Sequence, residues 1–301
     1  MSIMPIIVPF KYGGNYNGVE LVADTIVPYF TMKKKNFKLI KIAEELAEKD
    51  YFHNEKLKNI DIVIETNTKL RDMVQEIIKS GRFPLLIGGD HSLGLGSVAG
   101  VLEHYEDLGI IWIDAHGDMN TEKTTLSGNI HGMTLALLQG IGNYKLINVL
   151  PNGKKIKSEN ILIFGIRDLD PLENELIKKH GINYLKYDDI STKGIEKANK
   201  YILDFFKNKV KHIHISLDLD SLNPAVFPGV SVPVGGGFNL MQLKETISVL
   251  FNNFTITSMD VVELNVMNDV NKSTEKAMVQ IIELVYELVS SDKKASLGDC
   301  V

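Results

Sequence analysis

The chain has 301 residues, of which 44% are hydrophobic and 24% are charged, a balance typical of a globular protein with a large core. Its formal net charge of -5 includes no long block of like charge, so we expect neither nucleic acid nor a membrane surface as a partner. The N-terminus lacks the basic region and long apolar core of a signal peptide, and no apolar run is long enough to span a membrane. The single cysteine, Cys300, permits no intramolecular disulfide, so we expect a cytoplasmic protein.

Short apolar runs rich in Ile, Val and Leu alternate with segments of helical periodicity along the chain. This pattern is typical of a parallel sheet with both faces covered, and because we find no repeat or linker, we expect a single α/β domain over residues 1–301. We expect strands near residues 3–8, 83–87, 109–113, 161–165, 182–185, 212–217 and 257–262. The apolar stripe from Leu70 to Ile78 predicts a helix that Gly81 ends. A last helix is predicted to begin near Ser273.

Three polar clusters directly follow predicted strands and contain the candidate metal ligands. They read Gly-Gly-Asp-His-Ser at residues 88–92, Asp-Ala-His-Gly-Asp at 114–118 and Ser-Leu-Asp-Leu-Asp at 216–220. Because ligands of open parallel sheets bind at the carboxyl ends of strands, the clusters can share one crevice. We expect the alternation of side chains along a strand to bring the acidic residues of each cluster to one face. The candidate ligands are His91, Asp114, His116, Asp118, Asp218 and Asp220.

These residues also allow another interpretation. Asp90 or Ser92 could cap a helix that starts near Leu93. Capping explains the other two clusters less well, because a cap needs one acceptor and leaves the remaining groups unexplained. A site rich in carboxylates, with two imidazoles and no thiolate, favours Mn²⁺, with other first-row divalent ions as alternatives. Two bridged ions activate water for attack on carbon or phosphorus, so we predict a hydrolase.

The three clusters resemble the signature motifs of the ureohydrolase family, which includes arginase and agmatinase, and the chain is most similar to arginase. The match extends from Val-Pro-Phe at residues 8–10 to Asn-Lys-Ser-Thr at 271–274. The resemblance implies a three-layer α/β/α sandwich around a mostly parallel sheet of about eight strands, in a homo-oligomer that is a trimer or a hexamer. It also implies two Mn²⁺ ions per subunit. One ion would take His91, Asp114, Asp118 and Asp218, and the other would take His116, Asp114, Asp218 and Asp220, with Asp114 and Asp218 bridging.

Residues 120–132 resemble the arginase loop that binds the α-carboxylate of arginine. The resemblance implies that Asn120, Thr125 and Ser127 donate hydrogen bonds to that carboxylate. Without it, the same loop would be interpreted as a solvated turn whose Ser, Thr and Asn side chains bond to local backbone. Because agmatine has no α-carboxylate, this loop favours L-arginine, hydrolysed to L-ornithine and urea.

Further positions acquire roles from the resemblance. Asp170 and Glu173 match the residues that contact the α-amino group of the substrate. Glu263 matches the carboxylate that pairs with the guanidinium, and a planar cation suits a bidentate acid. His131 matches an acid or base at the mouth of the site, and Asp118 would pass a proton to the leaving amine.

Two histidines, His212 and His214, share the strand parity of Asp218 and Asp220. An imidazole on an apolar strand is more often a hydrogen-bonded core residue than a ligand, and we interpret both in that way.

The chain departs from the family pattern beside the predicted chemistry. The family usually has Gly-Thr-Pro-Val where this chain has Ser-Val-Pro-Val at residues 231–234. A hydroxyl that would face the guanidinium is lost at Val232, and Ser231 is the candidate to replace it. The usual Glu-Val-Asn-Pro becomes Glu-Leu-Asn-Val, which ends at Val266.

Other functions therefore stay open. Agmatinase or another guanidino hydrolase is the nearest alternative, and a metal-binding relative without catalytic activity is the next. A nucleotide-binding module is a third, although the spacing of Gly94, Gly96 and Gly100 does not match the dinucleotide fingerprint.

Overall fold

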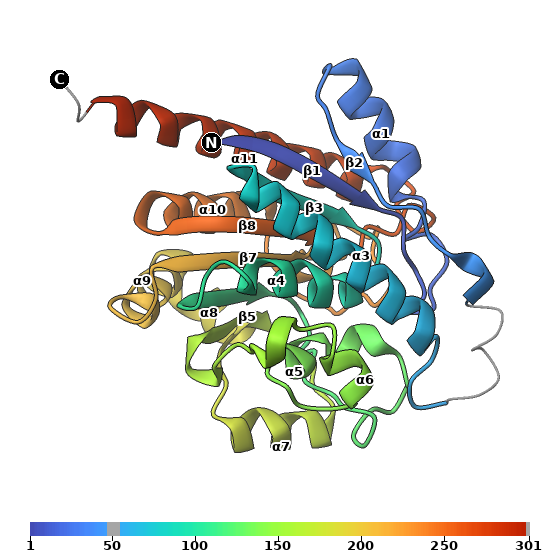
Figure 1. The fold of residues 1–301 in the computed structure, drawn as a ribbon. Helices are drawn as coiled ribbons and strands as arrows, with labels where there is room; N and C mark the ends of the chain where they lie inside the picture. Colours follow the sequence, from blue (N-terminus) through green and yellow to red (C-terminus); the bar gives the residue numbers. More distant parts are fainter. Residues whose placement is uncertain (47–54, 299–301) are drawn as a thin grey trace.

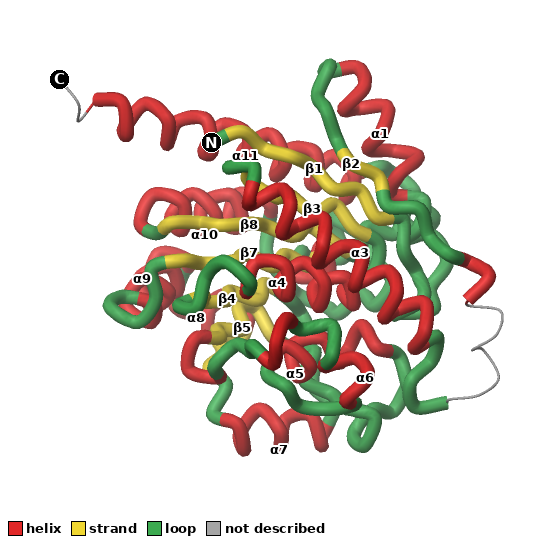
Figure 2. Tube along the Cα trace, viewed as in Figure 1, coloured by secondary structure: helices red, strands yellow, loops and turns green. Residues whose placement is uncertain are grey.

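One parallel sheet of eight strands organises the computed structural model, which describes residues 1–46 and 55–298. The strands are β1 (Ser2–Val8), β2 (Lys38–Leu39), β3 (Arg82–Gly88), β4 (Leu108–Ile113), β5 (Ile161–Ile166), β6 (Asn183–Lys186), β7 (His212–Asp218) and β8 (Thr255–Val262). Their order in the sheet is β2-β1-β3-β8-β7-β4-β5-β6, and helices cover both faces (Figure 1, Figure 2). The expected three-layer α/β/α sandwich is confirmed.

The two helical layers exist because successive residues of the strands are apolar and point to opposite faces. In β1, Ile6 and Val8 belong to one core and Ile7 belongs to the other. The first core is covered by α3 (Ile60–Lys79), α4 (Gly94–Leu102), α5 (Thr134–Leu138), α6 (Tyr144–Ile147) and α7 (Pro171–His180). The second is covered by α1 (Val22–Met32), α8 (Tyr187–Lys193), α9 (Ile195–Phe206), α10 (Leu240–Asn253) and α11 (Ser273–Gly298).

Seven strands were predicted close to their observed positions, and β2 was missed. This strand has two residues, pairs with the edge of β1 and leaves Leu39 exposed, so it gives no apolar run in the sequence. The last helix begins at Ser273 as predicted, and Gly81, with φ 71°, follows the end of α3. Cys300 lies outside the described residues. No helix among the described residues is long and apolar enough to cross a membrane.

The four central strands end side by side and define where a site can form. In the sheet register Ile87 of β3 pairs with Val261 of β8, which pairs with Leu217 of β7, which pairs with Ile113 of β4. The chain passes from β3 across β8 and β7 to reach β4, so a topological switch lies among these strands. In doubly wound sheets such a switch opens a crevice beyond the carboxyl ends.

The glycines of α4 allow that helix to pack closely on α3. A Cβ on Gly96 would overlap the carbonyl oxygen of Asn67, and one on Gly100 would overlap Val74. The backbone N–H of Gly96 also donates to Asn67 Oδ1 at 2.7 Å. Close helix packing therefore accounts for the glycine-rich run after β3 that the sequence left open as a nucleotide-binding turn.

We expect Gly96→Ala to lower the free energy of unfolding by about 1–3 kcal/mol, because the added methyl overpacks the contact between α3 and α4. Urea denaturation followed by circular dichroism would measure the change. Gly235→Ala is the matched control, since a Cβ there meets no atom within 4 Å. If Gly96→Ala stabilised the protein, as alanine does at an exposed helical glycine, the packing argument would be wrong.

Candidate metal and substrate site

The polar clusters lie in turns beyond the strand ends. Strand β4 ends at Ile113, so the segment from Asp114 onward is no longer extended, and Asp118 has a φ of 49°. Asp218 is the last residue of β7, and Asp220 lies in the 3₁₀ turn η6 (Leu219–Ser221). The prediction that strand alternation brings these residues together is therefore wrong. Tight turns bring them together instead.

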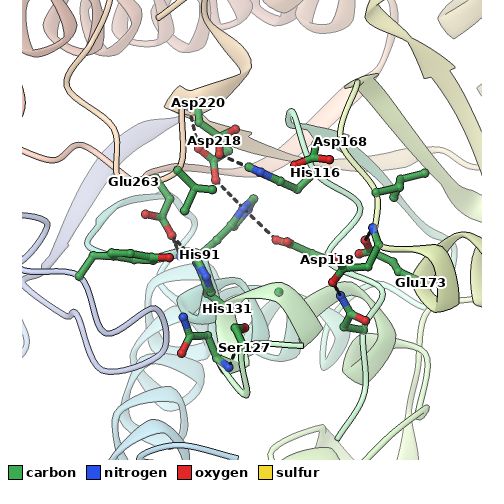
Figure 3. A pocket seen from close by; sticks show the side chains of 17 residues that line it. His91, His116, Asp118, Ser127, His131, Asp168, Glu173, Asp218, Asp220 and Glu263 are labelled. Atoms are coloured by element: carbon green, nitrogen blue, oxygen red, sulfur yellow. Dashed lines mark hydrogen bonds and ion pairs between the residues drawn. The ribbon is translucent and has the colours of Figure 1, made fainter. Parts of the chain in front are cut away.

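The first donor group centres on the buried His91, in the 3₁₀ turn η2 (His91–Leu93) after β3. Its Nδ1 lies 3.0 Å from Asp114 Oδ2, 3.1 Å from Asp218 Oδ2 and 3.2 Å from Asp118 Oδ2. Figure 3 shows His91, Asp118 and Asp218 turned toward one another. Three strands thus contribute oxygen and nitrogen donors to one point.

The second donor group centres on His116. Its Nδ1 lies 2.9 Å from Asp220 Oδ2 and 3.4 Å from Asp114 Oδ1. Asp114 therefore offers one oxygen to each group. Asp218 offers Oδ2 to the first group, whereas its Oδ1 accepts the backbone N–H of Asp220 at 2.7 Å.

The unpartnered atoms of these groups fit bound cations. Among the described residues, His91 Nδ1 and Asp118 Oδ2 are buried without a hydrogen-bond partner. The donor atoms of His91, Asp114 and Asp218 lie within 4.8 Å of one another, as do those of Asp114, His116 and Asp220. Buried carboxylates this close together need positive charge, and imidazole with carboxylate is a donor set that divalent metals accept. The residues present therefore fit two divalent cations.

The electrostatics of the metal-free groups favour bound protons. Burial, together with the charge of neighbouring carboxylates, raises the pKa of Asp118 and of Asp218 well above the usual range. Burial alone would lower the pKa of His91 and His116, but the surrounding aspartates raise the pKa of both well above the usual value. These shifts favour protonation of the four side chains in the absence of a cation.

Ser216 and Asp90 orient the first donor group, although neither is a candidate ligand. Ser216 Oγ lies 2.8 Å from His91 Nε2, which leaves Nδ1 to face the carboxylates. Asp90 caps the η2 turn by accepting the backbone N–H of Ser92, and it also accepts the N–H of Gly13 at 2.8 Å. Asp90 is thus a cap, but of the η2 turn rather than of α4, which has no side-chain cap. His91 of the same cluster faces the donor group.

A cavity of about 210 Å³ opens beside both groups (Figure 3). Its lining includes Tyr16, Asn120, Ser127, Asn129, His131, Asp168, Asp170, Glu173, Val232 and Glu263, together with five of the six candidate ligands. Tyr16, Asn129 and Asp168 were not predicted, although Asn129 lies within the loop that the sequence singled out. Among the described residues that line the cavity, Thr125 does not appear, and its hydroxyl accepts the backbone N–H of Gly128 instead.

Glu263 and His131 form a pair at the wall of the cavity. Glu263, with a φ of 66°, directly follows β8, and its Oε1 accepts the backbone N–H of His91 at 2.9 Å. The same oxygen lies 3.0 Å from His131 Nδ1. Burial alone would lower the pKa of His131, but Glu263 and nearby carboxylates raise it to about 9. A non-glycine residue held in the left-handed region signals that surrounding contacts hold Glu263 in place.

Asp170 and Glu173 have structural partners as well as a position on the cavity wall. They form a capping box at the start of α7, in which Glu173 Oε2 accepts the backbone N–H of Asp170. Asn120 Nδ2 donates to Asp170 Oδ2 at 3.0 Å, which ties the loop after Asp118 to this helix. Burial raises the pKa of Glu173 to about 7.

The hydroxyl lost at Val232 is not replaced. Ser231 Oγ accepts a hydrogen bond from Asn265 Nδ2 at 3.0 Å, and Val232 is the residue of this pair that lines the cavity. This part of the wall is therefore aliphatic.

The two strand histidines have different surroundings. His214 is fully buried, with Nδ1 2.7 Å from Ser258 Oγ and Nε2 3.1 Å from Asp260 Oδ2. His212 pairs with Asp107 at 2.6 Å but is only half-buried. The interpretation as a hydrogen-bonded core residue is right for His214, whereas His212 forms a pair at the surface.

An α/β/α sandwich with two adjacent His and Asp groups at the carboxyl edge of its sheet is the arrangement of a binuclear metallohydrolase. Residues 6–287 match the model of the arginase family, and the chain belongs to that family. An arginase of Bacillus subtilis (strain 168) is 41% identical over 231 residues, covering 77% of this chain and 78% of that protein. The predicted membership of the ureohydrolases is thus confirmed.

Solved structures agree with the sequence comparison. The crystal structure of arginase from Bacillus cereus has a TM-score of 0.85 and 34% identity, covering 95% of this chain and 98% of that one. Arginase from Entamoeba histolytica, solved in complex with L-ornithine, has a TM-score of 0.84 and 28% identity, covering 96% of this chain and 99% of that one.

Because the pKa values of His91 and His116 are raised, we expect metal binding at pH 7 to release protons, and metal affinity to fall as the pH falls. Calorimetric titration of Mn²⁺ into metal-free protein, in two buffers of different ionisation enthalpy, would count the protons. The same titration into each buffer alone is the control. Binding with no proton release would show that the donors are already deprotonated at that pH.

Proposed function

We propose that this protein hydrolyses the guanidinium group of L-arginine to give L-ornithine and urea. The observation that carries the proposal is the pair of His and Asp donor groups opening on a cavity beside Glu263. The relatives named arginase, at 41% identity in sequence and at a TM-score of 0.85 in structure, support the same reaction. This makes the protein a hydrolase of C–N bonds in linear amidines.

Two divalent cations would occupy the donor groups. One would be held by His91, Asp114, Asp118 and Asp218, and the other by His116, Asp114, Asp218 and Asp220. When bound, the ions would supply Lewis acidity and would make a water molecule more acidic. Mn²⁺ suits the four carboxylates and two imidazoles better than a metal that prefers thiolates.

Three side chains of the cavity would handle the guanidinium and its protons. Glu263 would hold the guanidinium against the attacking water, with the backbone N–H of His91 fixing one of its oxygens. Asp118 would take a proton from the attacking water and give it to the leaving amine of ornithine. His131, paired with Glu263 and with 17% of its side chain exposed, would exchange protons with solvent.

The loop after Asp118 and the start of α7 would select the amino-acid end of the substrate. Asn120 and Ser127 would donate to the α-carboxylate, and both line the cavity. Thr125 would complete this set after a movement of the loop that brings it to the cavity, which it does not line in this structure. Asp170 and Glu173, acidic groups that also line the cavity, would receive the α-amino group.

Other properties are part of the same proposal. We infer a homo-oligomer, either a trimer or a hexamer, built from a single arginase-like domain over residues 1–301. We also infer a cytoplasmic location, with a small molecule as partner and neither nucleic acid nor membrane. These inferences rest on the family, on the formal charge of -5 and on the single cysteine.

We expect the manganese-loaded protein to release urea from arginine and much less from agmatine, because agmatine gives the α-carboxylate donors nothing to bind. A urea assay on both compounds would measure this. Ser127→Ala should raise KM for arginine while leaving turnover of agmatine unchanged. Urea from agmatine alone would replace the proposal with agmatinase, and no urea from either compound would favour the non-catalytic alternative.

We expect Asp118→Asn to lower kcat by about 10²–10⁴-fold, because the amide cannot accept and return the proton. The metal content of the variant is measured alongside, since a drop in occupancy would lower the rate for a different reason. Asp188→Asn, an exposed carboxylate outside the cavity, is the matched control. Turnover near that of the wild type with both metals bound would remove Asp118 from the proton path.

A further inference from the structure

Trp112 is the only tryptophan of the chain and lies directly beside the first donor group. It is the penultimate residue of β4 and is fully buried. Its side chain belongs to the core that α3 and α4 cover, and Asp114, the residue that serves both donor groups, follows two residues later, just past the end of the strand. A large aromatic side chain thus lies in the core next to the candidate ligands.

The indole contacts two ligands in different ways. Its ring stacks on the His91 imidazole, with centroids 4.0 Å apart and planes inclined by 6°. Its Nε1–H donates to Asp114 Oδ2 at 3.0 Å. The stack fixes the plane of the imidazole, and the hydrogen bond fixes one oxygen of the carboxylate.

The carboxylate of Asp114 is held at both oxygens. The backbone N–H of His116 donates to Oδ1 at 2.7 Å, while the indole donates to Oδ2. Rotation of the carboxylate would break both bonds, so Oδ2 stays turned to His91 and Oδ1 stays turned to His116. The indole therefore helps to decide which oxygen serves which donor group.

The indole itself has little room to move. A Cβ on Gly94 would lie 3.0 Å from Trp112 Cη2 and 3.2 Å from Thr134 Cγ2, so glycine leaves just enough space for the ring. Thr134 in turn donates its hydroxyl to the carbonyl oxygen of His91 at 3.2 Å. Contacts with Gly94 and Thr134 therefore restrict the movement of the Trp112 ring and of the His91 backbone.

We propose that Trp112 is a positioning residue that presets His91 and Asp114 for the first cation, and that its fluorescence reports the occupancy of that position. The proposal rests on the binuclear centre inferred above and deepens it. Since the indole is neutral, it orients the ligands without supplying the positive charge that the carboxylates need. Its loss should weaken metal binding while the six ligands stay in place.

The first test replaces Trp112 by Phe, which keeps a buried ring and removes the N–H donor. We expect metal affinity to fall by about 10–100-fold. At a chelator concentration where the wild type keeps two ions, Trp112→Phe should keep one or none. Phe83→Leu, in the core on the opposite face of the sheet, controls for general loss of packing. Equal retention of both ions by Trp112→Phe and the wild type would overturn the proposal.

The second test begins with the wild type, so its main result does not depend on whether a variant folds. Titration of metal-free wild type with Mn²⁺, a paramagnetic quencher, should lower tryptophan emission and saturate with the first equivalent. Gly94→Ala, which pushes on the ring, should shift that titration to higher Mn²⁺ concentrations. Emission that stays constant while two ions bind would contradict the proposal.

The two proposals fail differently. If the wild type binds no divalent ion and releases no urea, the proposed function falls. If it binds two ions and releases urea while Trp112→Phe retains metal like the wild type, only the role of Trp112 falls.

Discussion

The crowding of four buried carboxylates at the carboxyl ends of the central strands is the constraint on which the rest of this structure depends. Asp114, Asp118, Asp218 and Asp220 have side chains that are at most 9% exposed, and two imidazoles lie between them. Burying such a cluster is unfavourable unless positive charge enters it, and protons or cations are the two sources. The same constraint that costs stability in the metal-free protein gives the site its affinity for divalent ions.

Two parts of the scaffold bring these residues together: the strands set where each polar segment begins, and the turns after them set where the side chains point. The strands β3, β8, β7 and β4 end at the same level of the sheet, and one polar segment follows each of them. The parallel register thus brings together segments that are far apart in the sequence. Short turns then aim the side chains, with Asp118 and Glu263 held in the left-handed region. Backbone strain of this kind persists only where surrounding contacts over-determine it, as they do at functional sites.

The wall of the cavity is built from side chains that also hold the fold together. Asp170 and Glu173 cap α7, and Glu263 accepts the backbone N–H of His91. A bound substrate would therefore either replace these hydrogen bonds or form additional ones to the same side chains. Side chains already held by such bonds need little further ordering to orient a small cationic substrate.

The sequence by itself determined the identity of the candidate ligands and the positions along the chain of the strands that precede them. Motifs such as Asp-Ala-His-Gly-Asp after an apolar run can be recognised from neighbouring residues alone, and so can the start of the last helix at Ser273. Repeated apolar runs likewise predicted seven of the eight strands. Only the two-residue edge strand β2 lacked such a signal.

The tertiary structure alone decided how these residues meet. That Asp114 divides its oxygens, that Ser231 turns to Asn265, and that Thr125 bonds within its loop all depend on partners or turns that no periodicity encodes. Trp112 gave no functional signal in the sequence, because an apolar strand residue is ordinarily core. Its contact with His91, which follows the strand β3, exists only once the central strands of the sheet are assembled.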